Sequence, residues 1–445
     1  MRDRLSPALR NRDHGGGYVA WRISPRWQWP RMPVTAGFAA VRIGGCYFAK
    51  DRDSPDAHFL EERAAVMMVA VRFPSEQSNA IAWIASNDRS YHLSGDDPMI
   101  YNVQTLRAIA AYLVVGFHCQ ILLFGDLKYS MGAWGVDIFF VISGFVMAYT
   151  TDGRNVSPRQ FIVKRLVRVL PLYWFMTIAV FLTALSMPFL FRSVDAGPAQ
   201  LLMSLAFIPF EKSNGLIQPV LFLGWTLNYE IFFYCLFCLS LYIQTELNRY
   251  LCLSLTMVAL VILGAMFRPE DALGRFYTDP IILEFVAGIW IYYIARHVAI
   301  LTSLFNVPMI GTLGLASFGL LLAAEFLWPT VPRFIGLGLP AASLVLAAIL
   351  LETKGVVSKT AFAIEQGNSS YALYLTHFLS YQLCEKIVFK AFDPQSLYLR
   401  LAAFVGAVAL AGILAWIVHR QIEIPLTQSV RDVFTGFWRR SPARR

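Results

Sequence analysis

The chain has 445 residues, of which 57% are apolar and only 15% are charged. Soluble domains carry about a quarter charged residues, so this composition excludes an ordinary soluble protein and predicts an integral membrane protein. The formal net charge of +9 is compatible with a nucleic-acid partner. The basic residues, however, cluster beside apolar segments, which is the pattern that sets the topology of membrane proteins. We therefore expect a lipid bilayer, and no nucleic acid, among the partners.

Residues 1–98 differ from the rest of the chain. They are rich in Arg, Asp, Gly and Pro, and their apolar patches are too short to cross a bilayer. They also lack the apolar core of a secretory signal, so we expect a poorly ordered N-terminal extension. An alternative hypothesis is that translation starts at Met99 and that the upstream part is an artefact of gene prediction. A peptide from before Met99, recovered from the native protein, would contradict this alternative.

Beyond the extension, apolar runs predict an all-α membrane domain of about ten transmembrane helices in one bundle, over residues 99–428, followed by a basic cytoplasmic tail over 429–445. The expected runs are 105–124, 133–150, 169–190, 221–243, 250–267, 281–296, 305–326, 334–351, 370–391 and 397–418. Basic residues gather in the loop after the second run and in the tail, which the positive-inside rule places in the cytoplasm. Both ends of the membrane domain are then cytoplasmic, and the loops 191–220 and 268–280 face outside.

The six cysteines show no paired spacing outside the apolar runs, so we predict no disulfide framework. Cys235 and Cys238 form a C-x-x-C pattern inside a predicted span. No histidine or further cysteine accompanies them, so packing is favoured over a metal or redox role. We expect no metal site.

The first two apolar runs contain residues that are costly to place in lipid. Arg107 and His118 are eleven positions apart, so they share one helix face about 16 Å apart along the axis. Asp137 begins the second run. Such groups should face a protein interior or a polar cavity. A buried neutral imidazole can accept a proton from a hydroxyl, whereas a structural histidine and an interfacial arginine are the simpler alternatives.

A basic stretch precedes the third run. Arg165 and Arg168 are three positions apart on a predicted helix and project to the same side, next to Lys164. Two guanidinium groups on one face suit a phosphate or pyrophosphate. Charge alone is equally compatible with a positive-inside anchor.

Polar residues also lie within the fourth and ninth runs. Glu230, with Trp225 and Asn228 near it, needs a partner inside the membrane, and His118 or an arginine is the candidate. Tyr374 and His377 are three apart on one helix face, where packing is a simple interpretation for the tyrosine. Glycines such as Gly135 and Gly144 favour close helix contact over phosphate binding.

Six motifs in one order resemble the membrane-bound acyltransferase type 3 family of sugar and glycan O-acyltransferases, over about the last three quarters of the chain. They are LRAIAAYLVVGFH (Leu106–His118), GVDIFFVISGFVM (Gly135–Met147), KRLVRVLPLYW (Lys164–Trp174), GWTLNYEIFFY (Gly224–Tyr234), SSYALYLTHF (Ser369–Phe378) and IEIPL (Ile422–Leu426). WTLNYE and the LAFIPF run (Leu205–Phe210) look most like the branch that decorates exopolysaccharides. The resemblance implies a ten-helix core, a donor acyl-CoA bound from the cytoplasm and a glycan acceptor.

The resemblance also implies roles for single residues. Arg107 and His118 match the family's Arg-x10-His pair, with an essential histidine, and Arg165 and Arg168 match its R-x-x-R, proposed to hold the donor. We expect His118 to act as base or acyl carrier, with Glu230 orienting it and Arg107 stabilising an oxyanion. Lys164 would assist the two donor arginines. Asp137, Trp225, Asn228, Tyr374 and His377 are expected to contact substrate or support the site.

The expected function is transfer of an acetyl or similar short acyl group from acyl-CoA to a hydroxyl of an exopolysaccharide or its lipid-linked precursor. Acetyl-CoA or another short acyl-CoA is then a co-substrate, with no permanently bound cofactor, and polysaccharide assembly proteins are further partners to test. The expected location is the inner membrane of a bacterial cell. Intramembrane charges also suit a transporter or flippase of a glycan precursor, although no inverted repeat is evident. A non-catalytic subunit of a polysaccharide assembly complex is the third alternative.

Overall fold

The computed structural model describes residues 99–124, 131–154, 156–187, 197–297, 304–327, 330–391 and 396–440, all within one compact unit. The expected N-terminal extension, residues 1–98, lies outside the described residues. Within them, the chain is helical, and the only β pairing is one isolated bridge between Glu211 and Ile217. The all-α prediction is therefore confirmed for the described part.

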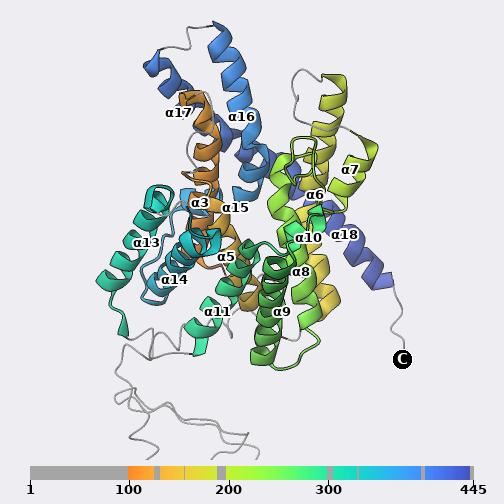
Figure 1. The fold of residues 1–445 in the computed structure, drawn as a ribbon, viewed down its shortest axis with the longest axis vertical. Coiled ribbons are helices and arrows are strands. Elements are labelled where there is room, and N and C mark those ends of the chain that lie inside the picture. Colours follow the sequence, from red (N-terminus) through yellow and green to blue (C-terminus); the bar gives the residue numbers. More distant parts are fainter. Residues whose placement is uncertain are drawn as a thin grey trace, which may run out of the picture. The chain divides into compact units, whose positions relative to one another are not determined.

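Figure 1 shows the helices of the described residues in chain order by colour. They are α3 (Tyr101–Cys119), α4 (Ile121–Phe124), α5 (Gly135–Thr151), α6 (Pro158–Ser186), α7 (Pro198–Leu205), α8 (Trp225–Ser240), α9 (Glu246–Phe267), α10 (Ala272–Tyr277), α11 (Leu283–His297), α13 (Val307–Leu327), α14 (Leu339–Thr353), α15 (Ala361–Asn368), α16 (Ser370–Ala391), α17 (Leu397–Val418) and α18 (Ile424–Arg440). Single helical turns occupy Phe222–Gly224, Pro280–Ile282, Phe334–Gly338 and His419–Glu423.

Each expected apolar run contains a helix, but several boundaries differ from the prediction, most of all at the start of the third run and at the tail. Eight helical stretches of the described residues are long and apolar enough to cross a membrane, and α5 is a shorter apolar helix. The helix expected at 169–190 begins earlier, at Pro158, because the Ser157 hydroxyl accepts the N–H of Gln160 and proline suits the first turn. The expected start of the tail at residue 429 falls inside α18, since the backbone stays helical from α17 through His419–Glu423.

Helix α3 lies at the centre of the packing, because it contacts α5, α14, α15, α16 and α17. Its first turn is held by Glu352 of α14, whose carboxylate accepts the N–H groups of Tyr101 at 2.8 Å and Asn102 at 2.7 Å. A carboxylate here satisfies orphan N–H groups and complements the positive end of the helix dipole. This anchor fixes the helix that carries Arg107 and His118.

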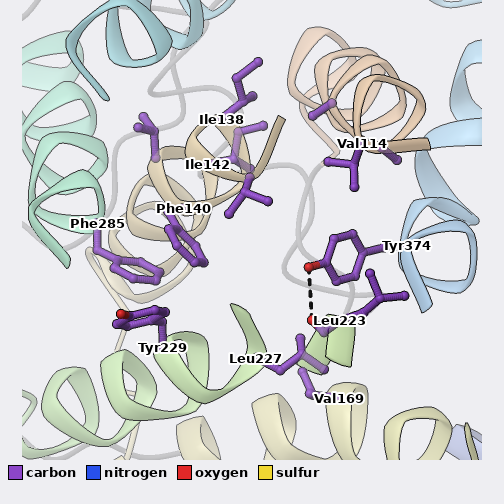
Figure 2. Close-up of a cluster of buried hydrophobic side chains, with 14 of the residues drawn as sticks. Val114, Ile138, Phe140, Ile142, Val169, Leu223, Leu227, Tyr229, Phe285 and Tyr374 are labelled. Carbon is purple, nitrogen blue, oxygen red and sulfur yellow. Dashed lines mark hydrogen bonds between the residues drawn. The ribbon is translucent and has the colours of Figure 1, made fainter. Parts of the chain in front are cut away.

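Aromatic and branched side chains of α5, α8 and α11 fill the core beside α3. Figure 2 shows Phe140, Tyr229 and Phe285 gathered on one side of this cluster and Tyr374 on the other. The rings of Phe140 and Phe285 are 4.7 Å apart between centroids, and Phe140 meets Tyr229 edge to face. Such contacts stabilise beyond the burial of apolar area.

Glycines bring α5 against α3 and α11. A Cβ atom at Gly144 would lie 2.0 Å from the carbonyl oxygen of Phe285, and one at Gly135 would lie 2.3 Å from that of Ala110. Gly288 of α11 approaches Val141 in the same way. Small residues let membrane helices approach closely, so the geometry agrees with the interpretation of Gly135 and Gly144 as contact residues.

We expect Gly144→Ala to force α5 and α11 apart and to destabilise the protein by about 2 kcal/mol, the usual scale of overpacking. The matched control is Gly311→Ala in α13, where a Cβ meets nothing within 4 Å. That change should be neutral or slightly stabilising, because alanine is the better helix former. Thermal unfolding of the two purified variants in the same detergent checks the difference. Equal unfolding midpoints would show that the α5–α11 contact is dispensable.

Candidate active site

The two ends of α3 face different cavities. Arg107 and His118 lie on the same helix face, but they line separate cavities. His118 lines a cavity of about 480 Å³, which we call the histidine cavity. Arg107 lines two others: a central cavity of about 120 Å³, and an arginine cavity of about 490 Å³ that includes the start of α3 and α18. The helical rise separates the two side chains by about 16 Å along the axis.

Four arginines line the arginine cavity: Arg431 of α18, and a group of three that also lines the central cavity. Arg165 and Arg168 come from α6, as the sequence predicts, and Arg107 joins them from α3. Arg165 donates to the Thr150 hydroxyl at 2.6 Å. Lys164 is exposed and lines none of the three cavities. The site therefore has an arginine triad in place of the expected pair with a lysine, and this triad suits a ligand with several phosphate oxygens.

Glu230 faces the central cavity together with the three arginines. Its carboxylate accepts hydrogen bonds from the hydroxyl of Tyr234 and, at 3.5 Å, from that of Ser143. Of the two partners considered from the sequence, the arginines share its cavity and His118 does not. The expectation that Glu230 orients His118 is therefore not met by the geometry, because the two side chains line different cavities.

His377 of α16 is the hydrogen-bond partner of His118. Nε2 of His377 lies 3.1 Å from Nδ1 of His118, and Nδ1 of His377 lies 2.8 Å from the carbonyl oxygen of Tyr374 and 3.2 Å from that of Leu373. His377 is wholly buried. The sequence places this histidine in the site, but its contact with His118 depends on the packing of α16 against α3.

The contacts determine the neutral form of both rings. A carbonyl oxygen only accepts, so the hydrogen of His377 is on Nδ1 and its Nε2 is an acceptor. Nδ1 of His118 must then carry the hydrogen, which it directs to His377 and to the carbonyl oxygen of Val114 at 2.9 Å. Nε2 of His118 is left with a free lone pair. This nitrogen is the one that can accept a proton or attack a carbonyl carbon.

Tyr374 separates the central cavity from the histidine cavity and lines both, as does Val136. Its hydroxyl donates to the carbonyl oxygen of Leu223 at 3.0 Å (Figure 2) and accepts from Thr226 at 2.8 Å. The central cavity shares Arg107, Arg165 and Arg168 with the arginine cavity. The three cavities thus adjoin in series, from the arginine triad to His118.

Two of the remaining predicted residues lie near the histidine cavity. Trp225 lines it, and Asp137 is buried behind Arg333, another lining residue. Asn228 is 2% exposed and lines none of the three cavities, and its Oδ1 has no hydrogen-bond partner among the described residues.

Several residues of these cavities escaped the sequence analysis. They are Ser143, Lys212, Thr226, Tyr234 and Arg333, and the buried Glu284 near Arg333 escaped it as well. A lone arginine directly before an apolar run is typical of an interfacial anchor, so Arg333 gave no distinct signal. Glu284 was detectable as a carboxylate inside the run 281–296.

Comparison with known proteins identifies the family of the chain. A family model described as an acyltransferase domain matches residues 100–420. The exopolysaccharide production protein ExoZ of Rhizobium meliloti (strain 1021) is 34% identical to the chain over 315 residues. That alignment covers 68% of this chain and 92% of the relative.

We expect His377→Ala to remove the acceptor of the His118 Nδ1–H group, so that the ring populates both neutral tautomers and turnover falls at least about tenfold with little change in KM. His377→Gln should restore part of the rate, because its amide oxygen can accept the same hydrogen. The ¹⁵N chemical shifts of His118 report the tautomer directly.

The matched control is His297→Ala. His297 also contacts the carbonyl oxygen four residues before it, that of Tyr293, but lines none of the cavities. Unchanged His118 shifts and turnover in His377→Ala would show that His377 has only a packing role.

Proposed function

The chain belongs to the acyltransferase family whose model matches residues 100–420, and from this membership we propose that it is a membrane O-acyltransferase acting on an exopolysaccharide or its lipid-linked precursor. It moves an acetyl or similar short acyl group from acyl-CoA to a sugar hydroxyl. The multi-pass helical architecture and the acyltransferase assignment agree with each other. The acceptor class is supported by the name of the Rhizobium relative, which concerns exopolysaccharide production.

The observation that carries this proposal is the series of cavities between the arginine triad and His118. Acyl-CoA has a cluster of phosphates at one end and a thioester at the other end of a long, flexible arm. Arg107, Arg165 and Arg168 hold the phosphates, and the arm extends through the central cavity past Tyr374. The thioester then reaches the histidine cavity, where the acceptor hydroxyl is bound.

His118 Nε2 removes the proton from the acceptor hydroxyl as its oxygen attacks the thioester carbonyl. The new ester C–O bond forms, the C–S bond breaks, and the thiolate of CoA takes the proton from the imidazolium. In the covalent variant, Nε2 attacks the thioester carbonyl first, the C–S bond breaks and CoA leaves as the thiolate. The acceptor hydroxyl then attacks the acyl-imidazolium, the C–N bond breaks, and the hydroxyl proton passes to the thiolate. The same lone pair serves both routes.

The geometry changes the role expected for Arg107. Its distance of about 16 Å along α3 from His118 is too great for contact with an oxyanion at the transferred carbonyl. We therefore assign Arg107 to the donor phosphates, together with the α6 arginines.

We further propose that the arginine cavity opens to the cytoplasm of a bacterial cell and that the chain lies in the inner membrane. The positive-inside rule supports this orientation, because the arginine-rich start of α6 and the α18 region line the arginine cavity. Lys212 and Gln218 of the loop expected outside line the histidine cavity instead. Donor and acceptor then approach from opposite faces.

In membranes given labelled acetyl-CoA, we expect label to enter glycan and His118→Ala to lower this transfer by about a hundredfold or more, the usual contribution of a general base. The His297→Ala variant serves as the control for histidine loss. Full transfer by His118→Ala would refute the catalytic role. Uptake of glycan precursor without covalent label would favour a transporter.

The donor end is tested by equilibrium binding of acetyl-CoA to the purified protein. Arg165→Ala and Arg168→Ala should each weaken binding about tenfold, since a hydrogen bond to a charged group contributes about 1.5–3 kcal/mol. Lys164→Ala on the same helix removes the same charge from an exposed position and should change affinity little. If all three variants bind acetyl-CoA as tightly as the wild type, the two arginines do not hold the donor and act only as topology anchors.

A further inference from the structure

The described residues that line the histidine cavity include two cations and no carboxylate. Arg333 comes from the turn before Phe334–Gly338, and Lys212 comes from the segment between α7 and α8. The Lys212 residue is only 6% exposed, so its ammonium is set into the wall of the cavity.

Arg333 is held in place by an ion pair with Asp137. Its Nε and Nη2 donate to Oδ1 of Asp137 at 3.0 Å and to Oδ2 at 2.7 Å, and Asp137 is wholly buried. The arginine side chain itself remains 37% exposed. A guanidinium has five N–H groups, so one edge is used by Asp137 and the Nη1 edge remains for a ligand.

A second carboxylate, Glu284 of α11, is also wholly buried and attracts Arg333. Neither Asp137 nor Glu284 lines the histidine cavity. Asp137 therefore positions the guanidinium, and neither acid presents negative charge to the cavity. Buried partners of this kind orient a functional group more rigidly than solvent does.

The other walls of the cavity suit a carbohydrate. Trp225 and Phe222 offer aromatic surface, and amide groups come from Asn214, Gln218 and Gln382. Aromatic rings pack against the C–H faces of sugars, and amides can donate to and accept from hydroxyls. The cavity volume of about 480 Å³ is in the range of small-molecule sites.

We propose that the histidine cavity binds its acceptor glycan through an anionic group, a carboxylate or a phosphate, that Arg333 and Lys212 hold while a hydroxyl of the same molecule faces His118. The proposal rests on the proposed function and specifies its acceptor. A planar guanidinium matches the two oxygens of either anion, and the ammonium adds a second charge. The anion belongs either to an acidic sugar or to the diphosphate of a lipid-linked precursor.

The test compares three acceptors with the purified full-length protein in nanodiscs at saturating acetyl-CoA. They are a neutral oligosaccharide, the same oligosaccharide with one sugar oxidised to a uronate, and the neutral oligosaccharide linked to a lipid diphosphate. We expect at least about a tenfold lower KM for one charged acceptor than for the neutral one, a size typical of one charge-assisted contact. The charged acceptor that is preferred identifies the source of the anion.

Lys212→Gln and the double variant Asp137→Asn/Arg333→Gln should reduce that preference about tenfold, towards equal KM values. The double variant removes both members of the ion pair, so no buried charge is left alone. The control is Arg275→Gln, which removes one positive charge from a residue paired with Glu211, beside Lys212 in sequence but outside the cavity lining. It should keep the preference. Equal KM values for all three acceptors in the wild type, or an unchanged preference in both cavity variants, would overturn the proposal.

Binding of the three acceptors to His118→Ala protein is measured in parallel, without turnover. A preference for a charged acceptor there supports the anion site even if no acetyl transfer is seen, and equal affinities oppose it. Transfer that depends on His118 but ignores acceptor charge would refute the anion site and leave the acyltransferase function intact.

Discussion

A charged or strongly polar side chain within a membrane protein must find a protein partner or a polar cavity, because lipid offers neither. The described helices meet this constraint with polar pairs, some between distant segments and some within one helix. Asp137 of α5 holds Arg333, and Tyr234 donates to Glu230 within α8. His118 of α3 meets His377 of α16. Each pair positions one member at a cavity, so satisfying the polar groups also builds the candidate site.

The spacing along α3 gives the site its length. One rigid helix carries the third arginine of the proposed donor end and the histidine of the proposed acceptor end, and Glu352 holds its first turn. A phosphate-bearing donor with a long arm fits this separation, whereas a short ligand would not contact both ends. Glycine contacts between α5 and α11 keep the helices around the central cavity close. Packing and chemistry are therefore coupled through the same helices.

The tautomer of His118 illustrates how backbone groups direct the chemistry. Carbonyl oxygens of α16 determine which nitrogen of His377 carries hydrogen, and His377 in turn determines the free nitrogen of His118. No ionised partner is needed for this arrangement, which suits a site surrounded by Phe117, Phe222 and other apolar groups. A charged partner such as Glu230 would have required further hydrogen bonds in the same buried region.

Much of the fold was predictable from the sequence alone, because the length of an apolar run and the position of basic residues depend on local composition. The helices, the Arg-x10-His spacing on α3 and the Arg165–Arg168 pair on α6 follow from such local rules. The partner of a buried polar group depends on which helices pack together. Only the tertiary structure therefore separated Glu230 from His118 and brought Arg107 to the α6 arginines. It also placed His377 against His118 and Arg333 in the wall of the histidine cavity, since these contacts join segments up to 259 residues apart.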